Sequence, residues 1–252
     1  MNSFRIDQVR VEVWRDLTEV NERAAELLIG IAREATSEQG AFTLALSGGS
    51  TPKALYELLA TEGKRSRIAW DKTHLFWTDE RCVPPDDPQS NYGMAQHALI
   101  SHVNIPPENV HRMHGEDDPQ LAADAYTAEL EKCFGAGDPR FSLILLGMGD
   151  DGHTASLFQN SSALAETSRT VAAGYIDKLF AHRLTLTRRT LNAASTIIFL
   201  VSGQSKAKAL CSVFGDSGND GSSLPARLVR PTSGELIWLV DEPAAELIDS
   251  SF

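Results

Sequence analysis

Residues 141–158 read FSLILLGMGDDGHTASLF, an apolar run that ends abruptly in glycines, two carboxylates and an imidazole. The run from Phe141 to Leu146 predicts a strand that is buried on both faces, as in a parallel sheet covered by helices. In open parallel α/β sheets, ligands bind beyond the carboxyl ends of the strands. The polar residues that follow Leu146 therefore lie where we expect a functional site.

The same order of elements recurs on both sides of this segment. Apolar residues at helical spacing predict a helix from Leu17 to Ala35, and a second helical pattern begins near Ala54. Strands that alternate with helices indicate an α/β fold, with an open, mainly parallel sheet and helices on both faces. Short apolar runs predict the other strands at 42–46, 73–77, 196–201 and 235–240, and helices are expected at 203–214 and 243–248.

Composition limits the class of protein. With 252 residues, 42% of them hydrophobic, the chain can build a large core, and we expect a single domain over residues 1–252. The net charge of -11 and the lack of a long basic run argue against a nucleic-acid partner. Three scattered cysteines indicate neither a disulfide framework nor a zinc site, and we expect neither a signal peptide nor a membrane span. A cytoplasmic protein is expected; the sequence does not decide its oligomeric state, and a monomer is slightly favoured.

A glycine-rich turn, SGGSTP at 47–52, follows the strand predicted at 42–46. Its glycines would let a ligand approach the backbone, and the amide groups at the start of the next helix would attract an anion. The alternative is an ordinary strand-to-helix turn capped by a hydroxyl, with Pro52 in the first helical position. The Gly-Lys-Ser/Thr ending of a Walker loop is absent. The candidate phosphate-binding residues of this turn are Gly48, Gly49, Ser50 and Thr51.

Three basic side chains are further candidates. Arg81 follows the strand predicted at 73–77 and could bind a phosphate or carboxylate oxygen, or could pair with the two acids beside it. Arg183 lies in the alternating segment 182–187, which predicts a half-buried strand, and Lys206 lies at a strand-to-helix junction. Each of them alone is more often a solvated surface residue. The position of Lys206 makes it the stronger candidate of the last two.

The segment 147–152 contains the literal pattern GxGxxG of dinucleotide-binding loops. Its two aspartates would face a pyrophosphate as like charges, and Asn160-Ser161-Ser162 would interrupt the helix that should follow. We therefore reject a nicotinamide cofactor. Residues 215–223, rich in glycine, serine and aspartate, are expected to form a surface loop, with a lid over the site as the less favoured alternative.

The same segment places Asp151 two residues before His153. Histidine is suited to proton transfer near neutral pH, and an adjacent carboxylate would fix its tautomer and favour its protonated form. A histidine that bonds only to its own loop is the alternative interpretation. Because two other candidate loops also follow predicted strands, we favour a catalytic role.

Two other chemistries find less support. The chain has no Gly-x-Ser-x-Gly elbow, so we do not expect a covalent serine. His111 and His114, with acids at 116–118, could suggest a metal, but prolines on both sides are typical of a polar loop. We therefore expect no metal.

Six motifs, taken in order, resemble those of the glucosamine-6-phosphate isomerase/6-phosphogluconolactonase family. The resemblance spans nearly the whole chain and implies a Rossmann-like α/β fold. It also implies hydrolysis of 6-phospho-D-glucono-1,5-lactone to 6-phospho-D-gluconate in the oxidative pentose phosphate pathway, with a phosphorylated sugar lactone as partner and no cofactor. The motifs are SGGSTP at 47–52, DERCVP at 79–84, SNY at 90–92, LGMGDDGHTASLF at 146–158, RLTLT at 183–187 and GQSKA at 203–207.

The resemblance also implies roles for individual residues. His153 would be the general base that activates water for attack on the lactone carbonyl, and Asp151 would orient it. Arg81 would stabilise charge on the substrate or the oxyanion. The phosphate would be held by Gly48, Gly49, Ser50, Thr51, Lys206 and Arg183.

Two departures from the family pattern bear on the choice of reaction. In the deaminase motif an acidic residue follows the histidine by five positions and assists ring opening, whereas Phe158 stands there in this chain. Gln159 stands where lactonases usually carry proline. Phe158 favours lactone hydrolysis over the main alternative, a sugar-phosphate isomerase or deaminase. A non-catalytic sugar-phosphate sensor is disfavoured because no DNA-binding or partner domain is appended.

Overall fold

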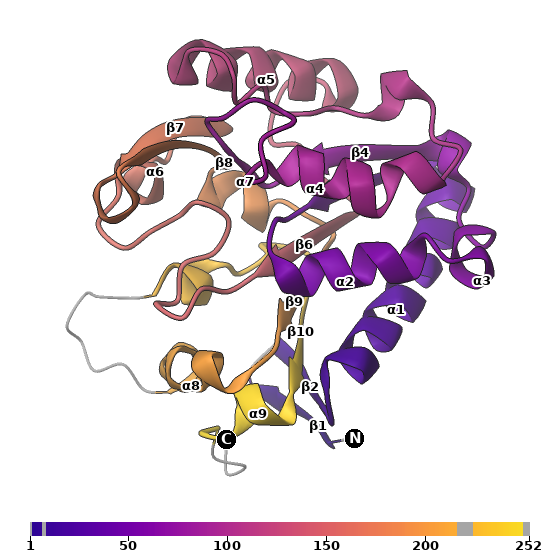
Figure 1. The fold of residues 1–252 in the computed structure, drawn as a ribbon, viewed down its shortest axis with the longest axis vertical. Helices are drawn as coiled ribbons and strands as arrows, with labels where there is room; N and C mark the ends of the chain where they lie inside the picture. Colours follow the sequence, from indigo (N-terminus) through magenta and orange to yellow (C-terminus); the bar gives the residue numbers. More distant parts are fainter. Residues whose placement is uncertain (1, 7–8, 216–223, 249–252) are drawn as a thin grey trace.

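The computed structural model describes residues 2–6, 9–215 and 224–248, which form an open sheet of seven strands (Figure 1). The strand order is β1-β2-β10-β9-β6-β3-β4, and neighbours are parallel except for β1 and β2. The α/β fold class, with a mainly parallel sheet, is confirmed. The strands of this sheet are β1 (Asn2–Ile6), β2 (Val9–Trp14), β3 (Phe42–Leu46), β4 (Thr73–Trp77), β6 (Leu143–Gly147), β9 (Thr196–Val201) and β10 (Glu235–Asp241).

The order of the strands reverses between β3 and β6. From β3 the chain continues outward to β4, whereas from β6 it continues in the opposite direction to β9 and β10. The loops that follow β3 and β6 run in opposite directions, and a crevice opens between them at the carboxyl edge of the sheet. The segment after β6, which the sequence singled out, lies at this crevice.

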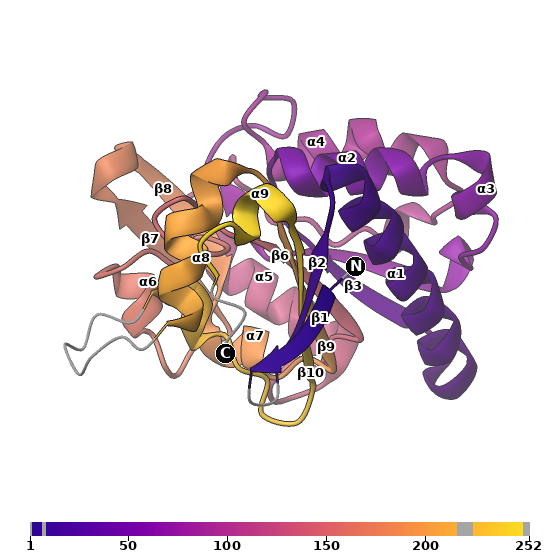
Figure 2. The same cartoon turned by 90° about the horizontal axis from the view of Figure 1, so that it is seen from below.

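Helices cover both faces of the sheet. In Figure 2, α1 lies on one side of β9 and β10, and α8 lies on the other. The indole of Trp238 stacks on Phe199 with ring centroids 3.9 Å apart and meets Phe214 of α8 edge-on at 5.1 Å, which fixes α8 against β10. The helices are α1 (Leu17–Gln39), α2 (Ser50–Leu59), α3 (Glu62–Arg65), α4 (Asn91–Ala98), α5 (Pro119–Phe134), α6 (Ser162–Ala165), α7 (Arg188–Asn192), α8 (Ala207–Phe214) and α9 (Glu242–Ala245).

The helix α1 shows why the sequence pattern was informative. The side chain of Asp16 accepts a hydrogen bond from the amide of Glu19 and caps the start of the helix. Gly40 ends it in the left-handed conformation, and its amide donates to the carbonyl of Thr36. The stripe that α1 buries against the sheet includes Val20, Ala24, Leu28, Ala32 and Ala35.

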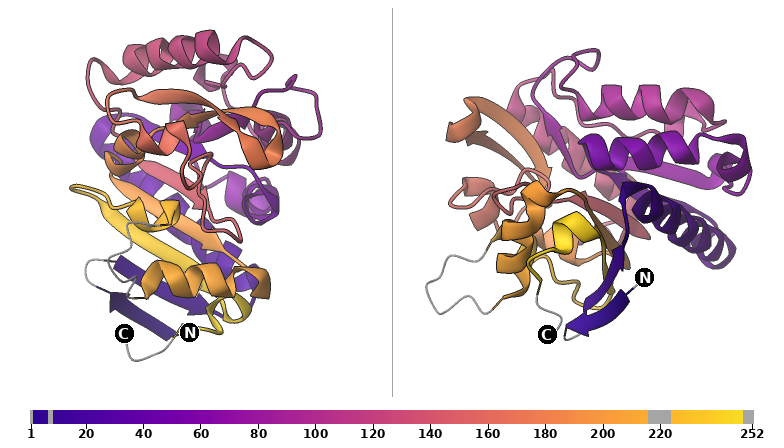
Figure 3. Two further views of the ribbon diagram at one scale, coloured as in Figure 1. Left: turned by 90° about the vertical axis from the view of Figure 1, so that its left-hand side faces the viewer. Right: turned by 60° about the horizontal axis from the view of Figure 1, so that its bottom comes forward.

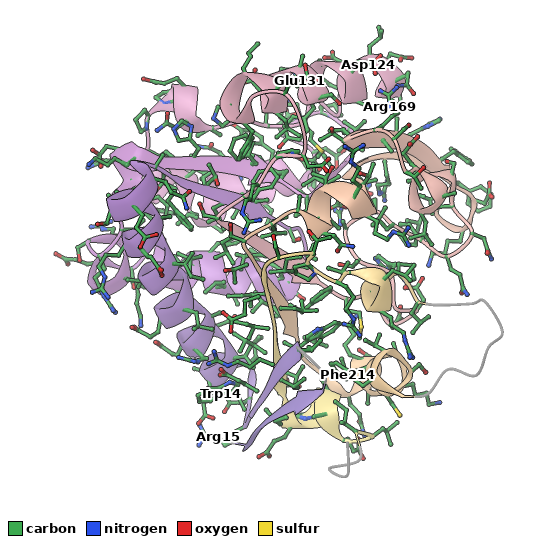
Figure 4. The ribbon with its side chains drawn as sticks, turned by 180° about the vertical axis from the view of Figure 1, so that it is seen from behind. Trp14, Arg15, Asp124, Glu131, Arg169 and Phe214 are labelled. Carbon is green, nitrogen blue, oxygen red and sulfur yellow. The ribbon has the colours of Figure 1, made fainter. Side chains whose placement is uncertain are left out.

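A second, antiparallel sheet lies beside the first in the order β5-β8-β7, formed by β5 (Asp79–Arg81), β8 (Ala181–Leu186) and β7 (Val171–Ile176). Helix α5 packs against β7 and β8 (Figure 3). An ion pair between Asp124 on α5 and Arg169 just before β7 ties the two regions together (Figure 4). Of this sheet, only the segment 182–187 was predicted as a strand.

Other differences from the sequence expectations are local. Strands β1 and β2 were not predicted, and the last helix ends at Ala245 rather than Ile248. The expected loop at 215–223 lies outside the described residues from 216 onward. Among the described helices, none is both long enough and apolar enough to cross a membrane.

Candidate functional site

A polar cavity of about 230 Å³ opens at the carboxyl edge of the main sheet. The loops after β3, β6 and β9 line it, together with β5, so segments far apart in the sequence meet there. Asp151 and Arg183 are not among its lining residues; Asp151 is bonded to His153, and Arg183 is paired with Arg81 across β5 and β8. The predicted residues that do line it are Gly48, Gly49, Ser50, Thr51, Arg81, His153 and Lys206.

His153 and Asp151 form a hydrogen-bonded pair in the loop after β6. The Nδ1 atom of His153 lies 2.5 Å from Oδ1 of Asp151, and the backbone amide of His153 donates to the same oxygen at 3.2 Å. The turn closes as the amide of Gly149 donates to the carbonyl of His153 at 2.8 Å. A Cβ at Gly149 would lie 2.1 Å from Nδ1 of His153, so this turn requires glycine there.

The surroundings of His153 decide its protonation. Burial lowers the pKa of this imidazole below its ordinary value of 6.5; Asp79 and Asp150 raise it, and the cations Lys206 and Arg81 lower it. The net shift is downward because burial outweighs the charges that favour protonation, and the expected effect of the adjacent Asp151 stays a prediction. At neutral pH the neutral imidazole predominates, which is the form that can accept a proton.

Two contacts around this pair were not foreseen in the sequence. The ring of Phe158 stacks on His153 with centroids 4.2 Å apart and an interplanar angle of 25°. Lys178, from the turn between β7 and β8, pairs with Oδ2 of Asp151 and lies 4.5 Å from the centroid of Phe158. Phe158 lies five residues after His153, so the sequence could have suggested a contact between the two rings. Lys178 lies far from Asp151 in the sequence and comes close to it only because the second sheet carries it there.

Asp79 is a buried carboxylate at the wall of the cavity that the sequence did not single out as a site residue. Its Oδ2 accepts from the hydroxyl of Ser156 at 2.7 Å, and its backbone carbonyl accepts from the amide group of Asn91 at 2.9 Å. Asn91 also fills the space beside Gly48, where a Cβ would lie 1.8 Å from its Oδ1. Asp79 thus joins the segment after β4 to the start of α4 and to the loop after β6.

Arg81 and Arg183 lie opposite each other on the antiparallel strands β5 and β8. Burial, and then the charge of Arg81, lower the pKa of Arg183. The guanidinium of Arg81 donates to the carbonyl of Gln89 at 2.5 Å, so it does not form the surface ion pair that was the alternative interpretation. Below it, the buried carboxylate of Glu80 instead accepts from three backbone amides and from the hydroxyl of Ser90.

The glycine-rich turn leads directly into α2. Gly49 is the N-cap, with φ of 105°, and the helix begins at Ser50, so Pro52 stands in the third helical position rather than the first. No side chain caps this end, so the hydroxyl cap of the alternative interpretation is absent, and Ser50 and Thr51 of the first turn line the cavity. The helix start therefore retains the anion-attracting character expected of it.

The loop after β9, which carries Lys206, is organised differently from the glycine-rich turn. Asp241 accepts hydrogen bonds from the hydroxyl of Ser202 at 2.5 Å and from the amide of Gly203 at 3.0 Å. This carboxylate holds the turn after β9, so the backbone of Gly203 is already bonded within the protein. Ser202 and Lys206 of this loop line the cavity, and Lys206 is the residue that brings a positive charge.

Comparison with known proteins agrees with the motifs. The sequence profile of the family described as glucosamine-6-phosphate isomerases/6-phosphogluconolactonase matches residues 15–238. The chain is 43% identical over 242 residues to the 6-phosphogluconolactonase of Nostoc sp., covering 94% of this chain and 98% of that protein. It is 45% identical over 229 residues to the 6-phosphogluconolactonase of Synechocystis sp., covering 89% and 92%. The solved structure of 6-phosphogluconolactonase from Trypanosoma brucei is 29% identical, with a TM-score of 0.83, and the match covers 95% of this chain and 98% of that one. The chain therefore belongs to the glucosamine-6-phosphate isomerase/6-phosphogluconolactonase family.

Proposed function

We propose that this protein hydrolyses 6-phospho-D-glucono-1,5-lactone to 6-phospho-D-gluconate, using His153 as the general base. The observation that supports this proposal most directly is the hydrogen bond between Nδ1 of His153 and Asp151, because His153 lines the polar cavity. With Nδ1 bound to the carboxylate, Nε2 is the nitrogen that can take a proton from water. The depressed pKa of His153 keeps that nitrogen unprotonated at neutral pH.

The proposed reaction needs only water and the side chains of the cavity. Nε2 of His153 accepts a proton as the water oxygen bonds to the lactone carbonyl carbon, giving a tetrahedral oxyanion. When this intermediate collapses, the bond from the carbonyl carbon to the ring oxygen breaks, and the imidazolium returns its proton to that oxygen. The product acid then ionises, so each turnover releases one proton to the solvent.

The cations of the cavity divide between the two ends of such a substrate. The start of α2 and the ammonium group of Lys206 suit a phosphate dianion, because amide donors and a positive charge meet there. Arg81 lies on the wall of the same cavity, where its guanidinium could stabilise the oxyanion, with Arg183 behind it. Binding through the phosphate would hold the lactone carbonyl near His153.

The alternative is ring opening and deamination or isomerisation of an amino-sugar phosphate. That reaction needs a second acid–base group near His153, whereas the ring of Phe158 occupies one of its faces. The test is to generate the lactone in situ and measure acid release above the spontaneous rate, with glucosamine 6-phosphate as a parallel substrate. We expect catalysed acid release from the lactone and no turnover of the amine; the reverse result would exclude the proposal.

A further inference from the structure

A second group of ligand-type side chains lies away from the cavity, between β4 and α5. His111 is buried, and its Nδ1 lies 2.9 Å from Oε1 of Glu129 and 3.9 Å from Sγ of Cys133. The three potential ligand atoms all lie within 4.8 Å of one another. The nearby His114 does not join them and instead lies 3.8 Å from Glu116 at the surface.

The fold brings these residues together from two directions. The amide of His111 donates to the carbonyl of Leu75 at 2.8 Å, which anchors this segment along the edge strand β4. Glu129 and Cys133 are four residues apart on α5, so they project from one face of that helix. A pair at this spacing plus a third residue from another element is a common way to hold a metal ion.

We propose that His111, Glu129 and Cys133 bind a divalent transition-metal ion of the zinc type. An imidazole nitrogen, a carboxylate oxygen and a thiolate sulfur are all zinc ligands, with bonds of about 2.0–2.3 Å. In a tetrahedral site such bonds place ligand atoms about 3.3–3.8 Å apart. The separations from His111 of 2.9 and 3.9 Å lie on either side of that range, and the ligand atoms of Glu129 and Cys133 lie within 4.8 Å of each other, so the three side chains would rotate to reach tetrahedral spacing.

His74 supplies the support that a metal-binding histidine needs. Its Nδ1 lies 3.0 Å from Nε2 of His111, and the two rings are nearly parallel, with centroids 5.3 Å apart. In the metal-free protein the bond to Glu129 places a proton on Nδ1 of His111, so Nε2 accepts from Nδ1–H of His74. Metal binding at Nδ1 would displace that proton, and His111 would then carry its proton on Nε2 and donate it to Nδ1 of His74 in its other tautomer.

The site also has an approach and an open coordination position. A cavity of about 610 Å³ lies over His111 and Glu129, between α4 and α5, and would admit the ion and a water molecule as fourth ligand. The positive charge that would repel a bound metal ion is that of Lys132, whose ammonium lies 3.0 Å from Oε2 of Glu129. A zinc-type ion binds the thiolate form of cysteine, so its binding at Cys133 would release the thiol proton.

Cobalt(II) is the probe, because a thiolate ligand produces a charge-transfer band and a tetrahedral site produces visible bands. We expect one equivalent of Co²⁺ to bind the whole protein with both signals, and Zn²⁺ to displace it. Cys133→Ser should remove the charge-transfer band and weaken binding by at least about 100-fold, the upper end of what losing a supporting partner costs. Glu129→Gln should weaken binding while retaining the thiolate band.

Matched controls come from the same protein. Cys211→Ser removes a thiol on α8, and Glu131→Gln removes a carboxylate from α5, where Figure 4 labels Glu131. Both controls should bind Co²⁺ like the unmodified chain. The proposal is overturned if the unmodified protein shows no saturable binding, or if Cys133→Ser and Cys211→Ser give the same spectrum and affinity. Because the readout is spectroscopic, it does not depend on the proposed lactone hydrolysis.

Discussion

The molecule contains two histidine–carboxylate pairs that share their bonding and differ in what lies around them. In each pair Nδ1 meets a carboxylate, at 2.5 Å for His153 and 2.9 Å for His111. Each imidazole also stacks on a phenylalanine, with centroids 4.2 Å from Phe158 and 4.4 Å from Phe76. The pairs differ at Nε2, because His74 meets this atom of His111, whereas His153 lines a cavity that also contains Arg81 and Lys206.

The comparison teaches that a histidine–carboxylate pair does not by itself define a catalyst. The carboxylate sets the tautomer in both pairs, but only one of them has access to a polar cavity with cations placed for an anionic substrate. The other pair is bonded on both ring nitrogens within the protein. Its neighbours, a thiol and a second imidazole, suit metal binding better than proton transfer to a sugar.

The largest expected difference between the pairs is in turnover. We expect His153→Ala to lower kcat by about 10²–10⁴-fold with little change in KM, because general-base assistance is lost. We expect His111→Asn to leave kcat nearly unchanged and to lower the free energy of unfolding by about 1–3 kcal/mol, because a buried hydrogen-bonded group is lost. Steady-state kinetics on the lactone and denaturant unfolding measure the two effects. Equal losses of kcat in both variants would contradict the comparison.

The second-largest effect is expected from the turn that holds His153 and Asp151. Gly149→Ala would place a Cβ 2.1 Å from Nδ1 of His153 and 2.6 Å from Oδ1 of Asp151, so the pair must move. A displacement of about 1 Å costs roughly 10²-fold in rate, and we expect kcat to fall by about that factor. Gly174→Ala is the control, since its nearest contact would be an ordinary 3.5 Å. Unchanged kcat in Gly149→Ala would show that the pair is not needed in this geometry.

The two regions should also differ in how a nearby lysine affects the KM for the substrate. Lys206→Ala removes a charge from the cavity of His153, and we expect KM to rise by about tenfold, as for the loss of one charge-assisted hydrogen bond. Lys132→Ala removes the corresponding charge beside Glu129 and should leave KM unchanged. Initial rates over a range of lactone concentrations decide the question. A higher KM for Lys132→Ala than for Lys206→Ala would place the phosphate elsewhere.

The smallest effect is on the pH profile. His153 is active as a base only when neutral, and burial lowers its pKa below 6.5, so activity should be greatest well above the lowered pKa. As pH falls through the lowered pKa, kcat/KM should decline, with a midpoint below 6.5. His111→Asn should keep the same midpoint. An acidic limb centred above 6.5 would mean that the imidazole is not depressed or is not the titrating base.

The strands predicted at 42–46, 73–77 and 196–201 agree with β3, β4 and β9. The interior strands β3 and β9 are continuous apolar runs because both their faces are covered, and the edge strand β4 is mostly buried as well. Strands β1, β2, β5 and β7 were missed. Of these, β2 lies near the sheet edge and mixes charges with valines, and β5 is only three residues long and polar.

The candidate site was partly foreseeable for the same reason. The carboxyl ends of parallel strands meet at one edge, so the loops with Gly48, His153 and Lys206 converge as expected. The contact of Lys178 with Asp151, and the metal-type grouping of His111 with Cys133, depend on how distant elements pair and pack. No local pattern in the sequence carries that information.

The register of β5 and β8 sets Arg81 directly across from Arg183. Two like charges in opposed positions oppose the pairing of the strands that carry them. An anion that binds in the cavity beside Arg81 offsets part of this repulsion, and it does so only in the native chain, because unfolding separates the two strands. Occupancy of the cavity and resistance to unfolding are therefore thermodynamically linked, so the protein should be easier to melt when it lacks an anionic ligand.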